Sequence, residues 1–167
     1  MERALQAGAR ALYKALEGAI NGLISGAYGA AGEEGVKLMI DRGWHVLDIL
    51  FNAAHGFVEY PKDLSPEAVQ RLEAFRRAAV KPALGALGLA KQIASRLPHE
   101  VLESKLTAKW ALEKLASKHP SVAQAIKEHP LGKEWLEAEM RILRLYLMGR
   151  AVYSPALRKL VEVPAVG

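Results

Sequence analysis

The sequence predicts an all-α protein with a long N-terminal helical arm, a compact helical bundle and a short extended C-terminal tail. Three observations support this fold class. The dominant residues are Ala, Leu, Glu, Lys and Arg, all good helix formers. Threonine occurs only at position 107, and no long run of β-branched residues is present. No segment keeps a period-two pattern. We therefore expect helix over well above half of the 167 residues, and no sheet.

The arm is expected to comprise residues 1–58. Its first helix should run from about Glu2 to Ser25, and its second from about Glu33 to Phe57. Glycines recur between residues 26 and 35, where they should loosen or bend the chain.

The bundle is expected over residues 59–153. Ser65-Pro66-Glu67 is a strong helix start, with a serine N-cap, a proline at the first helical position and an acid in the first turn. This helix should continue to Arg96, with a kink or break at Pro82. Leu97-Pro98 should open a fourth helix that ends near Lys118.

Prolines also mark the remaining elements. A short fifth helix should start at Pro120 and end at Pro130, and a sixth should cover about Leu131–Arg150. Residues 154–167 should form a last helical turn or two from Ser154-Pro155 and then an extended tail.

The first helix carries a narrow polar stripe, here called the polar seam. At about 100° per residue, its members fall within an arc of about 80°. They are Arg3, Arg10, Lys14, Glu17, Asn21, Ser25 and Tyr28. Most of the remaining circumference is Ala, Leu, Ile and Gly, the reverse of an ordinary surface helix. We therefore expect this helix not to fold back as an ordinary bundle member, and to be buried by other subunits.

Gly18, Gly22 and Gly26 lie four residues apart beside the polar seam. Small residues at this spacing allow a backbone to approach another helix or a ligand closely. Three interpretations remain open: packing against a helix inside the bundle, contact with a nucleic-acid backbone, and attachment to a membrane surface.

The helix expected from Ser65 repeats this theme. Basic residues and glycines share a face if the helix continues past Pro82; they are Arg71, Arg77, Lys81, Lys91, Gly85 and Gly88. Lys and Arg contact phosphates without reading sequence. Because Glu67 and Glu73 lie on the same arc, an ordinary solvated face remains an equal alternative.

The formal net charge is +5 and the sequence pI about 9.5, which permits a polyanionic partner. The charge is uneven, since residues 61–97 hold seven basic and three acidic side chains. Residues 1–60 hold five basic and seven acidic ones. A basic surface is therefore expected in the helix that begins at Ser65.

No motif predicts catalysis. Cysteine is absent, and the chain has no phosphate-binding loop, nucleophile elbow or dinucleotide fingerprint. His45 and His55 with Asp41 and Asp48 could hold a metal, but ordinary core or surface histidines are favoured. We expect no enzyme activity, no cofactor, no metal site and no small-molecule substrate.

Taken together, the chain resembles the major capsid proteins of filamentous viruses of hyperthermophilic archaea. The resemblance lies in the Ala/Gly-rich first helix with Arg3, Arg10, Lys14 and Asn21, the bundle over Ser65–Arg150 and the short apolar tail. Low Asn, Gln and Cys with many Glu, Lys and Arg is also a thermophile-like composition.

This resemblance implies a virion protein without enzymatic role. Paired capsid subunits, identical or paralogous, would form a helical filament whose helical arms wrap double-stranded DNA. The acids among the first 34 residues depart from the pattern, so Arg71–Lys91 or the partner subunit would have to complete phosphate neutralisation. The rival prediction is a cytoplasmic helical-bundle adaptor or regulator that docks on a protein through its Gly-rich first helix, and a weaker one is a peripheral membrane protein.

Overall fold

The computed structural model describes the backbone of residues 2–164 and the side chains of residues 8–164. About three quarters of this part of the chain is helical, which confirms the all-α prediction. The elements are α1 (Glu2–Arg42), α2 (Val46–Ala54), α3 (Pro66–Ala94), α4 (His99–Lys105), α5 (Ala108–Lys118), α6 (Pro120–Glu128), α7 (Gly132–Leu147), β1 (Ala151–Ser154) and β2 (Lys159–Glu162).

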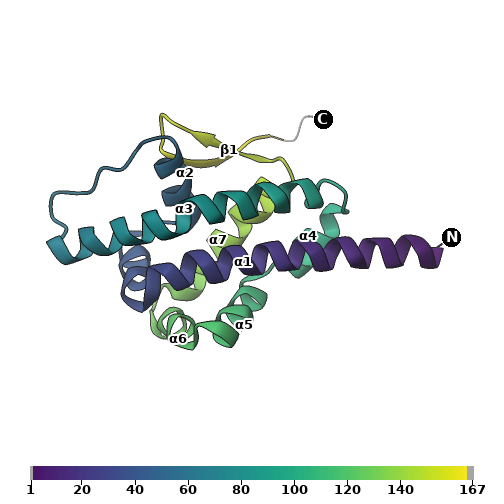
Figure 1. Ribbon diagram of the computed structural model, residues 1–167, viewed down its shortest axis with the longest axis horizontal. Coiled ribbons are helices and arrows are strands. Elements are labelled where there is room, and N and C mark those ends of the chain that lie inside the picture. The colour runs from purple at the N-terminus through teal and green to yellow at the C-terminus, as the bar shows by residue number, and fades with distance from the viewer. Residues whose placement is uncertain (1, 165–167) are drawn as a thin grey trace.

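The long helix α1 runs through the middle of the molecule (Figure 1). α3 lies antiparallel beside it, so the N-terminal half of α1 is next to the C-terminal half of α3. α5 and α6 pack on α1 from the other flank, and α7 packs on α3, α5 and α6. Among the described residues, this arrangement leaves one long side of α1 without a neighbouring element.

α1 continues through most of the glycines that were expected to interrupt it. Only Gly32 leaves helical geometry, with φ 73° and ψ 176°, and the helix kinks there. The stretch before the kink stays helical because Ala27, Tyr28 and Ala31 are buried in the core and hold it in place. The helix predicted over residues 33–57 is also wrong as one element, since Gly43 at φ 68° separates α1 from α2.

The predicted arm is not separate from the bundle. Leu16, Ile20, Leu23 and Ile24 are buried in the same hydrophobic cluster as Phe75 of α3. The expectation that other subunits must bury the large apolar residues of α1 is therefore wrong from Leu16 onward. The physical reason is that these residues cluster on one side of the helix, whereas its remaining apolar surface consists of small residues.

N-caps and prolines explain where the next helices begin and continue. Ser65 caps α3 as predicted, accepting the Ala68 N–H at 3.1 Å. α3 then continues through Pro82, whose ring is exposed, so the carbonyl that lacks its helical partner is free to bond water. The predicted helix over residues 98–118 is instead two helices, because the Thr107 hydroxyl accepts the Trp110 N–H at 3.1 Å and starts α5.

The C-terminal region differs from its prediction. In place of a helical turn at Ser154-Pro155, β1 and β2 form an antiparallel hairpin in which Ala151 pairs with Glu162. Ala151 and Leu160 turn into the core. Apolar side chains thus alternate inward over only four residues per strand. The end of the predicted extended tail, residues 165–167, lies outside the described part of the chain.

Within the described residues, the helices lack a segment long and apolar enough to cross a membrane.

Candidate nucleic-acid interface

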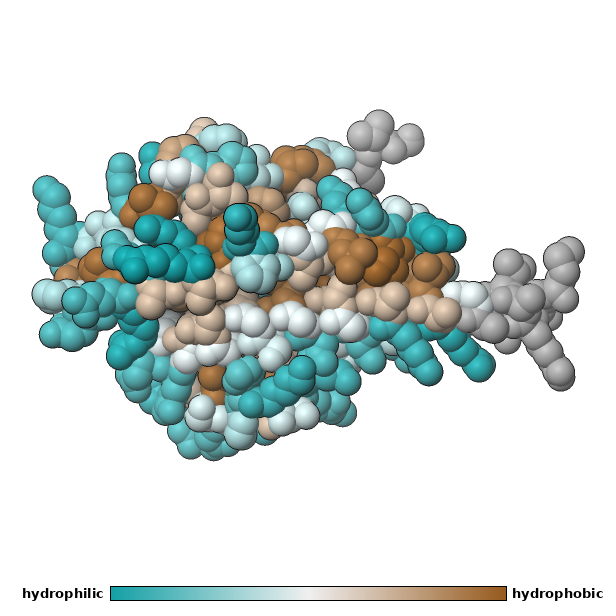
Figure 2. All heavy atoms as spheres, viewed as in Figure 1, coloured by the Kyte–Doolittle hydropathy of each residue, from teal (hydrophilic) through white to brown (hydrophobic). Residues whose placement is uncertain are grey.

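The open side of α1 is covered by the smallest side chains. Glycines and alanines three or four residues apart are exposed along it and are here called the Gly/Ala face. They are Gly8, Ala11, Ala15, Gly18, Gly22, Gly26 and Ala30. Figure 2 shows this face as a pale band along the helix, with mainly hydrophilic side chains below it and both hydrophilic and hydrophobic side chains above it.

The three glycines of the sequence prediction do not pack within the chain. A Cβ built on Gly18, Gly22 or Gly26 would meet no atom within 4 Å. The interpretation that they permit close helix packing inside this bundle is therefore wrong. Helix-interior glycine costs roughly 1 kcal/mol relative to alanine, and no contact among the described residues offsets this cost.

The middle of the polar seam is occupied by contacts within the chain. The Glu17 carboxylate accepts hydrogen bonds from the Trp110 Nε1–H of α5 and from the Tyr13 hydroxyl, each at 3.1 Å. Burial and the hydrogen bond to Glu17 raise the pKa of Tyr13 to about 12. Glu17 therefore ties α1 to α5 and does not face a ligand.

Beyond Glu17, the residues of the polar seam also contact other helices of the same chain. The Ser25 hydroxyl lies 3.1 Å from His119 Nε2 of α6. Tyr28 is buried, with its ring 5.8 Å from that of Trp135 in an edge-to-face pair. Asn21, predicted to bind nucleic acid, is half-buried in the same row. The polar seam was expected to be open, but over residues 17–28 it is covered by α5, α6 and α7.

The basic start of the seam remains open. Arg10 and Lys14 are exposed on α1, at the edge of the Gly/Ala face. The side chain of Arg3, predicted to belong with them, lies outside the described residues.

The predicted basic residues of α3 divide into two groups. Arg77 and Lys81 are exposed, and Arg77 makes only a 3.5 Å contact with Glu73. Arg71 is exposed beside the far end of α1, near Gly35. Lys91 is instead half-buried, with Nζ 4.6 Å from the ring centre of Tyr146 on α7. Lys91 is therefore not part of the same open surface.

The antiparallel packing of α1 and α3 brings two acid-free segments together. Residues 3–16 of α1 and residues 74–98, which include the second half of α3, contain no Asp or Glu. The second of these segments carries five basic residues, of which Arg77, Lys81 and Arg96 are exposed. Sequence reasoning missed Arg96, although the acid-free run itself was visible.

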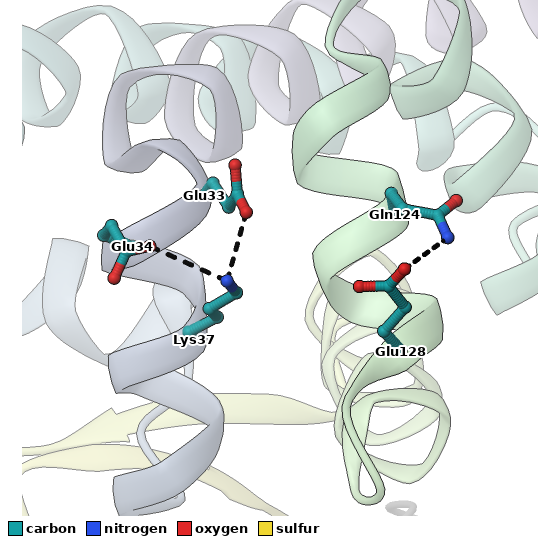
Figure 3. Close-up of polar contacts among 5 residues, drawn as sticks. All are labelled: Glu33, Glu34, Lys37, Gln124 and Glu128. Atoms are coloured by element: carbon teal, nitrogen blue, oxygen red, sulfur yellow. Dashed lines mark hydrogen bonds and ion pairs between the residues drawn. The ribbon is translucent and has the colours of Figure 1, made fainter.

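The opposite end of α1 is acidic. After the kink, Lys37 Nζ lies 3.1 Å from Glu33 and 3.6 Å from Glu34, so two carboxylates share one cation (Figure 3). On the neighbouring α6, Glu128 accepts a 2.8 Å hydrogen bond from Gln124. Charge is therefore distributed unevenly along the open surface of α1, which is basic near the N-terminus and acidic beyond Gly32.

The two histidines and two aspartates considered as possible metal ligands do not lie together. Asp41 lies 2.6 Å from His129, and His55 stacks on Tyr153 with ring centres 4.2 Å apart. His45 instead lies next to Glu139 of α7. The described residues hold no group of three ligands suited to a metal ion.

A buried carboxylate on α7 was not predicted. Glu139 is 1 % exposed, accepts the Val46 N–H, and has its Oε1 3.3 Å from His45 Nδ1. Burial raises its pKa, and the contact with His45 only partly offsets this. Burial alone would lower the pKa of His45, but the contact with Glu139 outweighs it and the net pKa is raised. The sequence signal was an acid at an apolar position between Trp135 and Met140.

These raised pKa values predict that the protein loses stability as pH rises from 5 to 8. The folded state holds protons on Glu139 and His45 more tightly than the unfolded chain, so unfolding becomes easier as they titrate. The expected effect is a fall in the free energy of unfolding across this pH range. Urea unfolding at several pH values measures it, and Glu139→Gln should flatten the curve. A wild type that gains stability over this range would contradict the prediction.

In comparisons with known proteins, no family model matches the chain, and no curated protein or solved structure is found to be similar to it. The functional argument therefore depends on the geometry of the chain's own residues.

Proposed function

We propose that this chain is a structural DNA-packaging protein, a capsid-like subunit that coats double-stranded DNA through contacts to phosphates and sugars. The observation that supports this best is the pairing of two acid-free segments, residues 3–16 of α1 and residues 74–98, with the exposed cations Arg10, Lys14 and Lys81 among them. Long flexible cations at this surface suit phosphate oxygens, which carry no sequence information.

The surface is poorly suited to reading bases. Its exposed polar residues include the cations Arg10, Lys14, Arg77 and Lys81 but only one exposed amide, Gln92, and Asn21 is half-buried. Base readout usually needs Arg, Asn or Gln grouped on one exposed recognition helix. A coating protein must accept every sequence, so backbone contact is what this function requires.

The Gly/Ala face would allow the helix to lie close to the duplex. From Gly8 to Ala30 it extends for about 33 Å at 1.5 Å per residue. This is close to one turn of double-stranded DNA, about 34–36 Å. Side chains no larger than a methyl group would let α1 follow the backbone and exclude water over that length.

One chain does not supply enough positive charge along the whole of α1, since Glu33 and Glu34 follow the kink. A partner subunit, identical or paralogous, would place its own basic end against the remaining phosphates. A helical filament of such pairs in a virion is the assembly that the capsid resemblance implies.

The test is DNA binding by Arg10→Ala/Lys14→Ala across a salt series. The double variant should bind all sequences more weakly by the same factor. It should also flatten the slope of log affinity against log salt by up to about one unit for each lost phosphate contact. The matched control is Lys127→Ala/Lys133→Ala, which removes two exposed charges from α6 and α7. The control should keep the wild-type slope.

The second candidate function is an adaptor that binds a helical protein partner. The observation in its favour is the same open Gly/Ala face, because small residues four apart also suit close helix packing. If the double variant keeps the wild-type DNA slope, or if its losses are confined to particular sequences, the adaptor function replaces the DNA-packaging one.

A further inference from the structure

A cavity of about 380 Å³ lies on another part of the molecule, away from the Gly/Ala face. Its walls come from the loop between α1 and α2, from α2 and the loop that follows it, from α3, and from the turn between β1 and β2 with the start of β2. Small-molecule sites usually have volumes of about 300–1,000 Å³, so this cavity is at the lower end of that range.

The cavity combines apolar walls with cations. Trp44, Ile49, Phe57 and Leu72 contribute apolar surface. Three basic side chains border the same space: Arg76, Arg158 and Lys159. This is the composition of a site for a molecule with an apolar body and an anionic group.

The three cations lack ion-pair partners within the described residues. Elsewhere Arg42 lies 2.8 Å from Asp63, and Arg141 lies 2.9 Å from Glu162. No carboxylate lies within 4.0 Å of the cations at the cavity, in the part of the chain that the structure describes. Two carboxylates also line the cavity, those of Asp48 and Glu59. The carboxylate of Asp48 already accepts the Leu160 N–H at 2.8 Å.

Arg158 occupies an uncommon backbone conformation at the edge of the cavity. Arg158 has φ 56°, the left-handed conformation that glycine adopts most easily. A larger residue in this conformation is uncommon. The guanidinium lies 4.0 Å from the ring centre of Phe57, beside the cavity.

The turn is also held firmly in place. The Asn52 side chain donates to the Arg158 carbonyl at 2.9 Å and accepts a hydrogen bond from the Tyr153 hydroxyl. Together with the contact from Asp48 to Leu160, these bonds fix the hairpin to α2. Arg76 is positioned from the other side by its 3.3 Å hydrogen bond to the Tyr60 hydroxyl. A site fixed in advance loses less entropy when a ligand binds.

We propose that this cavity binds a small organic anion with an aromatic body of about two rings and one phosphate or carboxylate group. A cavity of 150 Å³ holds one benzene ring, so about 380 Å³ suits roughly two. The anionic group contacts Arg158 and Arg76, and the rings pack against Trp44 and Phe57. The site is distinct from the proposed DNA surface and does not depend on it.

The experiment measures binding of 1-naphthyl phosphate and 1-naphthoate to the full chain by isothermal titration calorimetry. Inorganic phosphate and neutral 1-naphthol serve as the separate halves of the ligand. At least one of the two-part probes should bind about tenfold or more tightly than either half, and comparing them identifies the preferred anion. Arg158→Gly and Arg76→Gln should each weaken that probe by about tenfold or more, because each removes a charge-assisted contact.

Two further measurements separate binding from folding. Arg158→Gly relieves the left-handed backbone, so its thermal midpoint should stay at or above that of wild type while the probe affinity falls. Arg10→Ala/Lys14→Ala should keep the wild-type probe affinity even if DNA binding is lost. Equal affinity of 1-naphthol and both anionic probes, or unchanged binding in Arg158→Gly and Arg76→Gln, would overturn the proposal.

Discussion

Replacing Gly132 by alanine should lower the free energy of unfolding by about 3 kcal/mol or more. Gly132 is buried where α7 begins, against the end of α6. A Cβ at this position would lie 1.8 Å from the Ile126 carbonyl oxygen and 2.8 Å from its carbonyl carbon. Backbone cannot rotate away as a flexible side chain can, so α6 and α7 would have to separate. Denaturant unfolding followed by circular dichroism measures the effect.

The matched control is Gly88→Ala on α3. A Cβ on Gly88 would meet nothing within 4 Å. The same substitution should therefore leave stability unchanged or raise it by up to about 1 kcal/mol through helix propensity. Equal unfolding midpoints for the two variants would contradict the packing described for the turn between α6 and α7.

Two substitutions on opposite faces of α1 should have opposite consequences. Ile20 is fully buried, so Ile20→Ala should cost about 2–5 kcal/mol of stability. Gly22 is exposed with open space beyond it, so Gly22→Leu should leave the fold intact. The added side chain would nevertheless hold α1 away from any backbone that approaches the Gly/Ala face. Gly22→Leu should therefore block filament assembly and weaken DNA binding.

Unfolding and DNA-binding assays on the same preparations separate these effects. Gly22→Ala adds only a methyl group and provides the control for helix propensity. It should be at least as stable as wild type and should bind DNA more tightly than Gly22→Leu. If Gly22→Leu binds DNA and assembles as wild type does, the open face of α1 is not where the duplex lies.

Local signals predicted much of the fold. Ser65-Pro66-Glu67 identified the start of α3, and Pro120 the start of α6, because caps and prolines act within a few residues. The break at Thr107 was missed although that residue is a good N-cap. The hairpin was missed because four-residue strands are too short to establish a period-two pattern.

The candidate site could be predicted only in part. Helical periodicity placed Arg10 and Lys14 on one side of α1, and both are exposed. It could not show that Glu17 meets Trp110, because that contact joins residues 93 positions apart. Periodicity also treats glycine and leucine alike as apolar. The difference between the core face and the open Gly/Ala face therefore emerges only from packing.

The cavity could not be predicted from the sequence, because it depends entirely on tertiary structure. Arg76 and Arg158 are far apart in sequence, and they line the same cavity only because the hairpin of β1 and β2 packs on α2. No local pattern around either residue indicates that meeting.

The measurement that tests the DNA-packaging proposal most directly is the affinity of wild-type protein for two duplexes of unrelated sequence, across a salt series. The proposal predicts equal affinities for the two duplexes at each salt concentration. It also predicts a steep linear fall of log affinity with log salt, by about 0.9 units for each neutralised phosphate. Affinity that does not change with salt, or that belongs to one duplex alone, would contradict it.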